Sequence, residues 1–293
     1  MTTLDATTAR ASAEAAMADP ALTERVQRSF DGTASPRLRD IMRSLVSHLH
    51  AFAGEVGLTE GEWAAAVDFL TRLGKISDDK RQETILLSDV LGLSMLTIAI
   101  NHPHVDGITD STVFGPFFVA GSPEIAMGED LSGGASGQPC SYSGSVRSVL
   151  GAPVAGARIE VWHSDEAGNY DVQYADLSTP QGRGHLFTGA DGRYAFRSVL
   201  PEPYPIPMDG PVGDLLRATG RSPMRPAHVH FMITAPAYVT LITHVFRDGD
   251  PHLGSDAVFG EKESLVRGFE QVADEEPARF RMSYDFVLQD AGP

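Results

Sequence analysis

The residues of this sequence best placed to do chemistry are two histidines, His228 and His230, in the segment Arg225–Phe231 (RPAHVHF). On a β-strand, side chains two positions apart project from the same face, about 7 Å apart along the strand. Two imidazoles in this arrangement can bind one metal ion. The alternative is a half-buried strand that carries two histidines by coincidence, because histidine is common at partly buried positions.

Two tyrosines precede the histidines and offer a second kind of ligand. Tyr170 follows a turn sequence, Asp165–Asn169, and Tyr204 opens the segment Tyr204–Pro211 (YPIPMDGP). A phenol has a pKa near 10, so it binds a metal at neutral pH only when a strongly Lewis-acidic ion drives off its proton. Zinc more usually recruits cysteine, histidine and carboxylate, whereas ferric iron suits phenolate oxygen. The order of tyrosines and histidines therefore favours ferric iron.

The ordered set of two tyrosines, one arginine and two histidines resembles the intradiol ring-cleaving dioxygenases of the catechol and hydroxyquinol 1,2-dioxygenase family. The similarity extends in looser form from about residue 20 to the C-terminus. It implies one Fe(III) ion per chain and no organic cofactor. The residues that match the family's metal ligands are Tyr170, Tyr204, His228 and His230.

Arg225 stands directly before Pro226 in the histidine segment. Arginine stays charged, so beside an iron site it would interact with an anionic substrate. The resemblance implies that Arg225 stabilises charge developing on the substrate ring. It also implies a catalytic role for Tyr204, which leaves the metal carrying a substrate proton. The alternative for Arg225 is a surface ion pair with no catalytic role.

His244 departs from the catechol pattern, because catechol 1,2-dioxygenases usually present glutamine fourteen residues after the second histidine. The chain resembles hydroxyquinol 1,2-dioxygenases more closely here, and so does the segment Thr112–Phe118 (TVFGPFF). The predicted reaction converts hydroxyquinol (benzene-1,2,4-triol) and O2 to 3-hydroxy-cis,cis-muconate, the tautomer of maleylacetate. His244 is predicted to shape or polarise the pocket. A catechol or substituted-catechol 1,2-dioxygenase is the alternative.

Two other classes of protein fit parts of the pattern. A non-catalytic β-sandwich binding protein would use a similar scaffold without chemistry. A zinc hydrolase would use His228 and His230 without the tyrosines. The first predicts no bound metal, and the second predicts a colourless one.

Composition excludes several partners. The formal charge is 23 − 39, or −16, which leaves no basic surface for nucleic acid. Cys140 is the single cysteine, so an intrachain disulfide cannot form and a reducing compartment is expected. The N-terminus shows no leader pattern, and no segment approaches about 18 continuous apolar residues. We therefore expect a cytoplasmic protein with no membrane partner.

The first hundred residues favour helices. Residues 1–19 lack large apolar side chains and are predicted to form a flexible arm. Residues 20–104 form a predicted helical dimerisation and linker region, where apolar residues recur every three or four positions. Thr59 and Glu62 predict a capping box, and Gly74 a helix end. The segment Thr84–Ile100 is apolar nearly all round, which predicts one buried helix.

Residues 105–293 change to short apolar runs separated by Gly, Pro, Asn and Asp, which predicts a β-sandwich catalytic domain. Helices followed by mostly antiparallel strands give an α+β fold class with segregated layers. The resemblance implies that the N-terminal helices form a homodimer interface that encloses a bound lipid. Ordinary core packing of the same apolar helices is the alternative.

Overall fold

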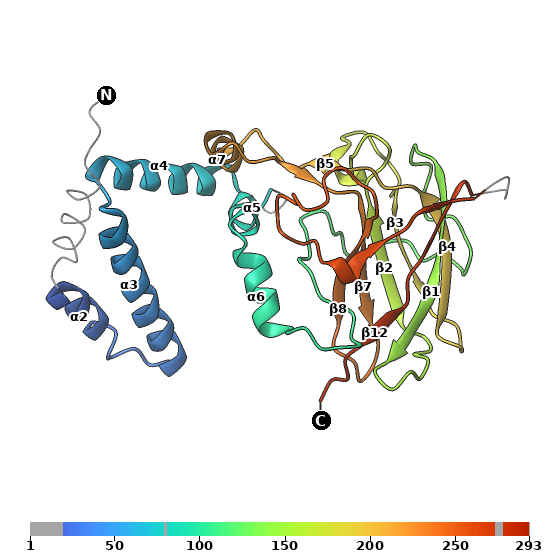
Figure 1. The fold of residues 1–293 in the computed structure, drawn as a ribbon, viewed down its shortest axis with the longest axis horizontal. Helices are drawn as coiled ribbons and strands as arrows, with labels where there is room; N and C mark the ends of the chain where they lie inside the picture. The colour runs from blue at the N-terminus through green and yellow to red at the C-terminus, as the bar shows by residue number, and fades with distance from the viewer. Residues whose placement is uncertain (1–19, 79–80, 273–277, 293) are drawn as a thin grey trace. The chain divides into compact units, whose positions relative to one another are not determined.

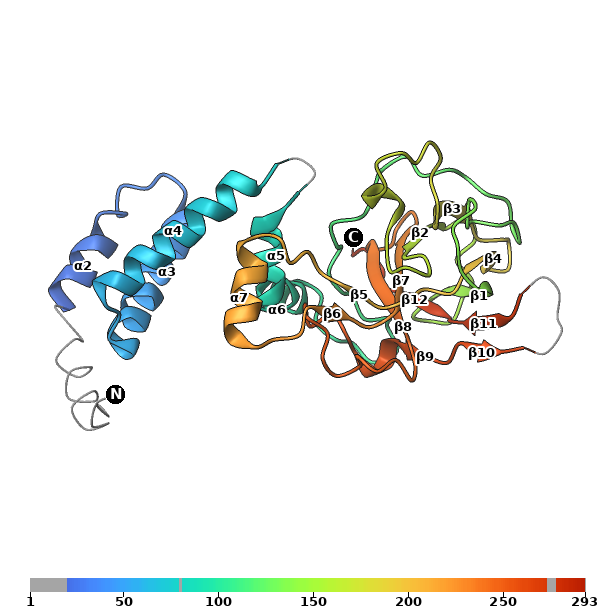
Figure 2. The same cartoon turned by 90° about the horizontal axis from the view of Figure 1, so that it is seen from above.

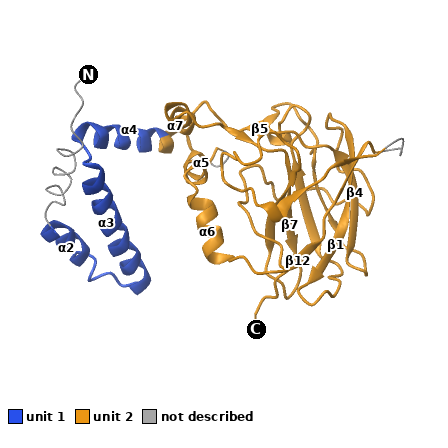
Figure 3. Cartoon of the chain, in the orientation of Figure 1, with its two compact units in different colours: residues 1–72 blue, residues 73–293 orange. Residues whose placement is uncertain are grey.

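The computed structural model of the chain describes residues 20–78, 81–272 and 278–292. The chain divides into two compact units, residues 1–72 and residues 73–293 (Figures 1 and 3). The flexible arm predicted for residues 1–19 lies outside the described residues. The domain boundary that we place between residues 104 and 105 stays a prediction.

Unit 1 is helical, in keeping with its apolar spacing. It contains α2 (Pro20–Arg28), α3 (Pro36–Val56) and most of α4 (Glu60–Ile76). Ser35 caps α3, because its hydroxyl accepts the N–H of Leu38 at 3.3 Å. Gly57 ends the same helix with a φ of 61°, a left-handed conformation that glycine adopts without strain.

Helix α4 begins as predicted but ends later. The N–H of Thr59 donates to Oε2 of Glu62 at 2.9 Å, and the N–H of Glu62 donates to Oγ1 of Thr59 at 3.2 Å. This is the reciprocal pattern of a capping box. The predicted end at Gly74 is wrong, because the helix continues to Ile76. Gly74 keeps a helical backbone, and its side of the helix is open, so nothing there forces a left-handed turn.

The single buried helix predicted for Thr84–Ile100 is wrong. The segment forms α5 (Glu83–Val90) and α6 (Leu93–Asn101), bent by 77° at a break where Gly92 has a φ of 72°. Much of its apolar surface is also exposed in the chain, with Leu96 at 57% and Ile100 at 70%. An apolar pattern shows that a surface needs covering, but not which chain covers it.

Among the described residues, no single helix has both the length and the apolar character to cross a membrane, and only the bent pair α5 and α6 passes that test together.

Ten of the described strands form two five-stranded sheets and the other two form a short ribbon, and these sheets together with the helices confirm the predicted α+β class (Figures 1 and 2). One sheet has the order β10-β11-β1-β12, with β4 also paired to β1, and the other has the order β3-β2-β7-β8-β9. Pairing is mostly antiparallel, but β1 runs parallel to β11 and β12, and β8 runs parallel to β9. The strands of the first sheet are β1 (Pro139–Ser148), β4 (Arg193–Val199), β10 (Glu270–Gln271), β11 (Phe280–Ser283) and β12 (Phe286–Leu288). Those of the second are β2 (Arg158–His163), β3 (Arg183–Phe187), β7 (His228–Thr234), β8 (Leu241–Arg247) and β9 (Val266–Arg267).

The main hydrophobic core includes side chains from both sheets, and alternation along β7 separates it from a second face. Val229, Phe231 and Ile233 belong to this core, where Phe231 packs 4.9 Å from Phe286 between ring centroids. The intervening residues of β7, which include both histidines of the metal-binding pattern, project from the opposite face. That face lies on the side of α5 and α6 (Figure 1).

A short ribbon supplies the remaining wall of this face. Strand β5 (Tyr204–Pro205) pairs antiparallel with β6 (Met224–Arg225), so that Tyr204 stands opposite Arg225. Helix α7 (Pro211–Thr219) connects the two strands and packs against α5 (Figure 2). The short helices η1 (Asp171–Gln173) and η2 (Glu263–Leu265) complete the described elements.

Candidate metal centre

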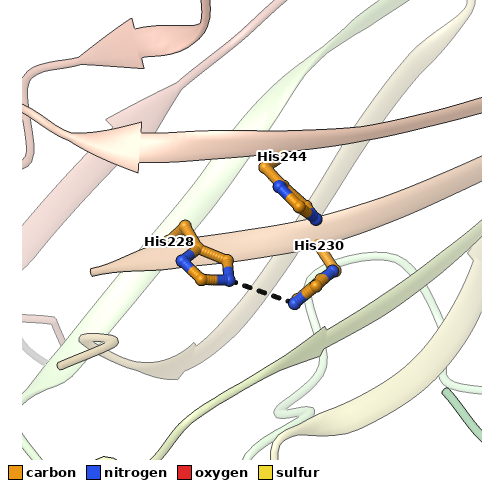
Figure 4. A group of neighbouring side chains, drawn as sticks. All are labelled: His228, His230 and His244. Carbon is orange, nitrogen blue, oxygen red and sulfur yellow. Dashed lines mark hydrogen bonds between the residues drawn. The ribbon is translucent and has the colours of Figure 1, made fainter. Parts of the chain in front are cut away.

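His228 and His230 meet on the second face of β7, as the alternation predicts. Their Nε2 atoms lie 3.1 Å apart (Figure 4). Nδ1 of His228 lies 2.6 Å from the carbonyl oxygen of Pro226, and this contact places the proton on Nδ1 and leaves Nε2 as a bare acceptor. Burial, aided by the charge of Arg225, lowers the pKa of His228 to about 3, and burial also holds the pKa of His230 well below its usual range. Both rings are therefore neutral bases at neutral pH.

The two predicted tyrosine ligands reach the same point from different loops. The Tyr170 oxygen lies 3.0 Å from Nε2 of His230, and the Tyr204 oxygen lies 3.4 Å from Nε2 of His228. The two phenol oxygens are 3.3 Å apart. The turn before Tyr170 depends on Gly168, whose φ is 76° and where a Cβ would lie 2.8 Å from the carbonyl oxygen of Pro203.

The four converging atoms form a donor set suited to a hard, highly charged ion. Contacts of 3.0 to 3.5 Å link two phenol oxygens and two imidazole nitrogens in a buried volume. Burial raises the pKa of Tyr170 well above its ordinary value, so the phenol stays protonated unless a strong Lewis acid displaces the proton. Ferric iron meets that requirement, and these residues fit it.

His244 joins the histidine pair from the neighbouring strand. On β8 it stands directly opposite His230, and the two ring centroids are 4.1 Å apart. One ring nitrogen from each of His228, His230 and His244 lies within 4.8 Å of the others (Figure 4). Burial, reinforced by the charges of His228 and Arg225, keeps the pKa of His244 well below its usual range; the Val113 backbone lies near enough to the ring to oppose this shift, but not at hydrogen-bond geometry to Nε2. Nε2 of His244 is buried and has no hydrogen-bond partner among the described residues.

Arg225 lies at the site, but in a buried ion pair and not in the surface pair of the alternative interpretation. Its side chain is 3% exposed and the side chain of Asp256 is 2% exposed. Nη1 of Arg225 lies 3.3 Å from the Tyr204 oxygen and 3.2 Å from Nε2 of His228. Burial is the largest single effect and would lower the pKa of Arg225, but the charge and hydrogen bonds of Asp256, together with Tyr204 and Tyr170, raise the pKa on balance. The guanidinium therefore remains charged beside the tyrosine.

Two acidic residues near the site escaped the sequence interpretation. Asp256 lies in the loop after β8 and shows no periodic or motif signal. Asp89 lies on α5 and is buried at 4% exposure, inside a segment that the apolar pattern dominated. Burial raises the pKa of Asp89, and its neighbouring charges are Arg225 and Asp256.

The segment Thr112–Phe118 forms an aromatic wall against the metal-binding side chains. Phe117 stacks on Tyr170 with ring centroids 4.5 Å apart, and Trp162 stacks on His230 at 4.7 Å. A Cβ at Gly115, where φ is 76°, would lie 3.0 Å from Cε1 of His230, so the close approach of this segment depends on glycine. The structure therefore places the segment that motivated the substrate prediction next to the predicted metal ligands.

Comparisons with known proteins show the family of the chain. Residues 113–290 match the family model described as "Dioxygenase", and residues 35–109 match "Catechol dioxygenase N terminus". The chain is 56% identical to a hydroxyquinol 1,2-dioxygenase of Nocardioides simplex, over 89% of this chain and 88% of the relative. It is 55% identical to a 6-chlorohydroxyquinol 1,2-dioxygenase of Cupriavidus pinatubonensis, over 91% and 96%. The crystal structure of a hydroxyquinol 1,2-dioxygenase from Pseudomonas putida superposes with a TM-score of 0.87, at 44% identity, over 92% of this chain and 98% of that chain.

Proposed function

The chain belongs to the catechol dioxygenase family, and we propose that it is an intradiol dioxygenase that opens the ring of hydroxyquinol. Both atoms of O2 enter between the two carbons that carry neighbouring hydroxyls, and the product is 3-hydroxy-cis,cis-muconate or its tautomer maleylacetate. The observation that carries the proposal is the buried convergence of two phenols and two neutral imidazoles beside a charged arginine.

The proposed ligands of one Fe(III) ion per chain are Tyr170, Tyr204, His228 and His230. When bound, ferric iron would supply a Lewis acid that lowers the pKa of the substrate hydroxyls, and their deprotonation would make the ring electron-rich. The protein contributes neutral imidazoles, because burial keeps both histidines deprotonated.

Tyr204 and Arg225 are the proposed catalytic residues, one for proton transfer and the other for charge stabilisation. The Tyr204 oxygen is the proposed base that takes a proton from a substrate hydroxyl, and Nη1 of Arg225 lies 3.3 Å from it. The same guanidinium is the proposed stabiliser of negative charge on the ring, because a fixed charge in a dry site acts strongly and needs no reorganisation. Phe117, stacked on Tyr170, and Trp162, stacked on His230, exclude water from the two ligands.

Two observations favour hydroxyquinol over catechol as the proposed substrate. The relatives that share 55% and 56% identity over most of the chain carry hydroxyquinol names. Beside the proposed ligands there is also a buried ring nitrogen, Nε2 of His244, that lacks a hydrogen-bond partner in the described part of the chain and suits an additional substrate hydroxyl. His244 is therefore the proposed pocket residue on the substrate side.

Exposed apolar side chains on the helices support a homodimer. Along α3, large apolar residues spaced three or four apart remain exposed: Leu38, Ile41, Leu45, Leu49 and Phe52. Helix α4 adds Trp63, Val67 and Leu70. Surfaces of this kind mark association sites, and a lipid held by the paired helices is the second proposed occupant. We propose a cytoplasmic location, which the single, buried cysteine Cys140 suits.

Metal analysis, a visible spectrum and oxygen uptake test the proposal on purified protein. The expected protein is red-brown from tyrosinate-to-Fe(III) charge transfer, and mass spectrometry with isotope-labelled oxygen should find both labelled atoms in the ring-opened product. A colourless, zinc-loaded protein of full activity would refute the iron proposal. A folded protein that binds the triol but consumes no oxygen would favour the non-catalytic alternative.

A further inference from the structure

The Asp256 carboxylate holds one edge of the Arg225 guanidinium. Oδ1 accepts from Nε of Arg225 at 3.0 Å, and Oδ2 lies 3.3 Å from Nη2. Nη1 contacts neither carboxylate oxygen within the described structure, and it faces the Tyr204 oxygen at 3.3 Å and Nε2 of His228 at 3.2 Å. Asp256 therefore binds Nε and Nη2 of the guanidinium, and Nη1 is left facing the proposed metal ligands.

The Asp256 carboxylate is itself held in place by the turn that contains it. Backbone N–H groups of Val258 and Gly260 donate to Oδ1 and Oδ2 of Asp256 at 3.3 and 2.9 Å. Phe259 has a φ of 59°, a conformation that bulky residues rarely adopt and that persists where the surroundings enforce it. A Cβ at Gly260 would lie 3.2 Å from both Nη2 of Arg225 and Oδ2 of Asp256, so the turn packs directly on the ion pair.

We propose that Asp256 is a positioning residue, which holds Arg225 so that Nη1 faces the oxygen of Tyr204. The proposal rests on the proposed function and adds a residue to it. Arginine has a long, flexible stem, and an electrostatic group accelerates a reaction only when it is already aimed at the atoms where charge develops. Asp256 fixes the orientation of the guanidinium through its two contacts with Nε and Nη2, the nitrogens that do not face Tyr204. The competing explanation is that Asp256 only balances the buried positive charge.

Two substitutions separate orientation from charge balance. Asp256→Asn keeps the size of the side chain and removes its charge, and Asp256→Glu keeps the charge and moves it by about one bond length, roughly 1.5 Å. We expect kcat to fall by about 10- to 100-fold in both variants, with KM changed much less, because the lost interaction acts in the transition state. A Glu variant with the kcat of the wild type would overturn the proposal. That variant keeps Arg225 paired, so it guards against a failure of the Asn variant to fold.

A double-mutant cycle tests whether Asp256 acts through Arg225. In an Arg225→Ala background, Asp256→Asn should leave kcat/KM within about twofold, because the group that it positions is gone. An equal loss in both backgrounds would show independent action and overturn the proposal. Glu83→Gln is the matched control, because Glu83 is also a buried carboxylate, 1% exposed and 3.0 Å from Nη2 of Arg81. It should retain wild-type kcat.

Two readouts do not depend on turnover. In a crystal structure of Asp256→Asn holoenzyme, Nη1 of Arg225 should have moved away from Tyr204, and an unchanged arginine would contradict the proposal. The visible band of the resting holoenzyme should shift in the same direction in Asp256→Asn and Arg225→Ala, because both substitutions disturb the surroundings of the Tyr204 oxygen. An unshifted band in Asp256→Asn would count against the positioning role of Asp256. A wild type without the iron band or ring cleavage is a failure of the proposed function, whereas a normal wild type with unaffected Asp256 variants is a failure of this inference alone.

Discussion

The substrate preference can be tested through His244. Its Nε2 atom is fully buried and lacks a hydrogen-bond partner within the described ranges. Leaving a buried polar group unpaired costs about 1–3 kcal/mol, and a substrate hydroxyl that pairs with it recovers that energy. Hydroxyquinol carries a hydroxyl that catechol lacks, so kcat/KM should favour hydroxyquinol by at least about tenfold, which corresponds to roughly 1.4 kcal/mol and lies within this range.

The perturbation is His244→Gln, which replaces the ring by a longer and more flexible amide. It should narrow the ratio of the two kcat/KM values, mainly by lowering the value for hydroxyquinol. Steady-state oxygen uptake with both substrates, at one pH and for wild type and variant, measures the ratio. His185→Gln is the control, because His185 is a partly buried histidine that contacts Ser122 and none of the proposed ligands. A wild type that prefers catechol would refute the substrate assignment, and an unchanged ratio in the variant would remove His244 from it.

The remaining predictions concern catalysis, the metal, assembly and pH. Arg225→Ala should keep its iron but lose about 10²- to 10³-fold in kcat, with little rescue by Lys, and wild-type turnover in the folded variant would exclude the catalytic role. Tyr204→Phe should shift the visible band and suppress turnover, and stopped-flow spectra with substrate check both effects. Phe52→Glu should convert a dimer to monomers in gel filtration, because Phe52 is 54% exposed in the single chain. Asp110 raises the pKa of His104, so the contact between them stabilises the fold below about pH 6.5 and is lost as the pH rises through the raised pKa of His104. The Tm of wild type should therefore exceed that of His104→Asn at about pH 5.5, and this difference should shrink as the pH is raised to about 9.

The periodicity of a strand was enough to bring two of the predicted ligands together. Because side chains alternate strictly, His228 and His230 had to share a face wherever the strand lay in the sandwich. Tyr170 and Tyr204 follow no such rule, since one precedes a short helix and the other opens a two-residue strand. Only the resemblance to a family joined them to the histidines.

Asp256 shows why the sequence could not reveal the whole site. It stands 31 positions after Arg225, in a turn whose shape depends on backbone N–H groups and on a residue with positive φ. None of these features has a periodic signature. The prediction of one buried helix for Thr84–Ile100 failed for another reason. Its apolar residues indicate that the surface is covered, but they do not identify the surface that covers it. The sequence encoded both features, but only packing in three dimensions connects them to neighbours.

The charge balance of the buried site favours a trivalent over a divalent ion. Arg225 and Asp256 cancel, so the balance depends on the metal and on the ionised oxygens around it. With two phenolates, a trivalent ion leaves a net charge of +1 and a divalent ion leaves zero. If a neutral diol gives one hydroxyl proton to Tyr204 and releases the other to solvent, the net charge of the site falls by one in either case. Binding of the diol therefore removes the net charge of a trivalent site but creates one at a divalent site, and binding is favoured in the first case because an unpaired charge is costly in a buried volume. A ferric ion, the protonation of Tyr204 and the Arg225–Asp256 ion pair together leave the buried site neutral when the diol is bound.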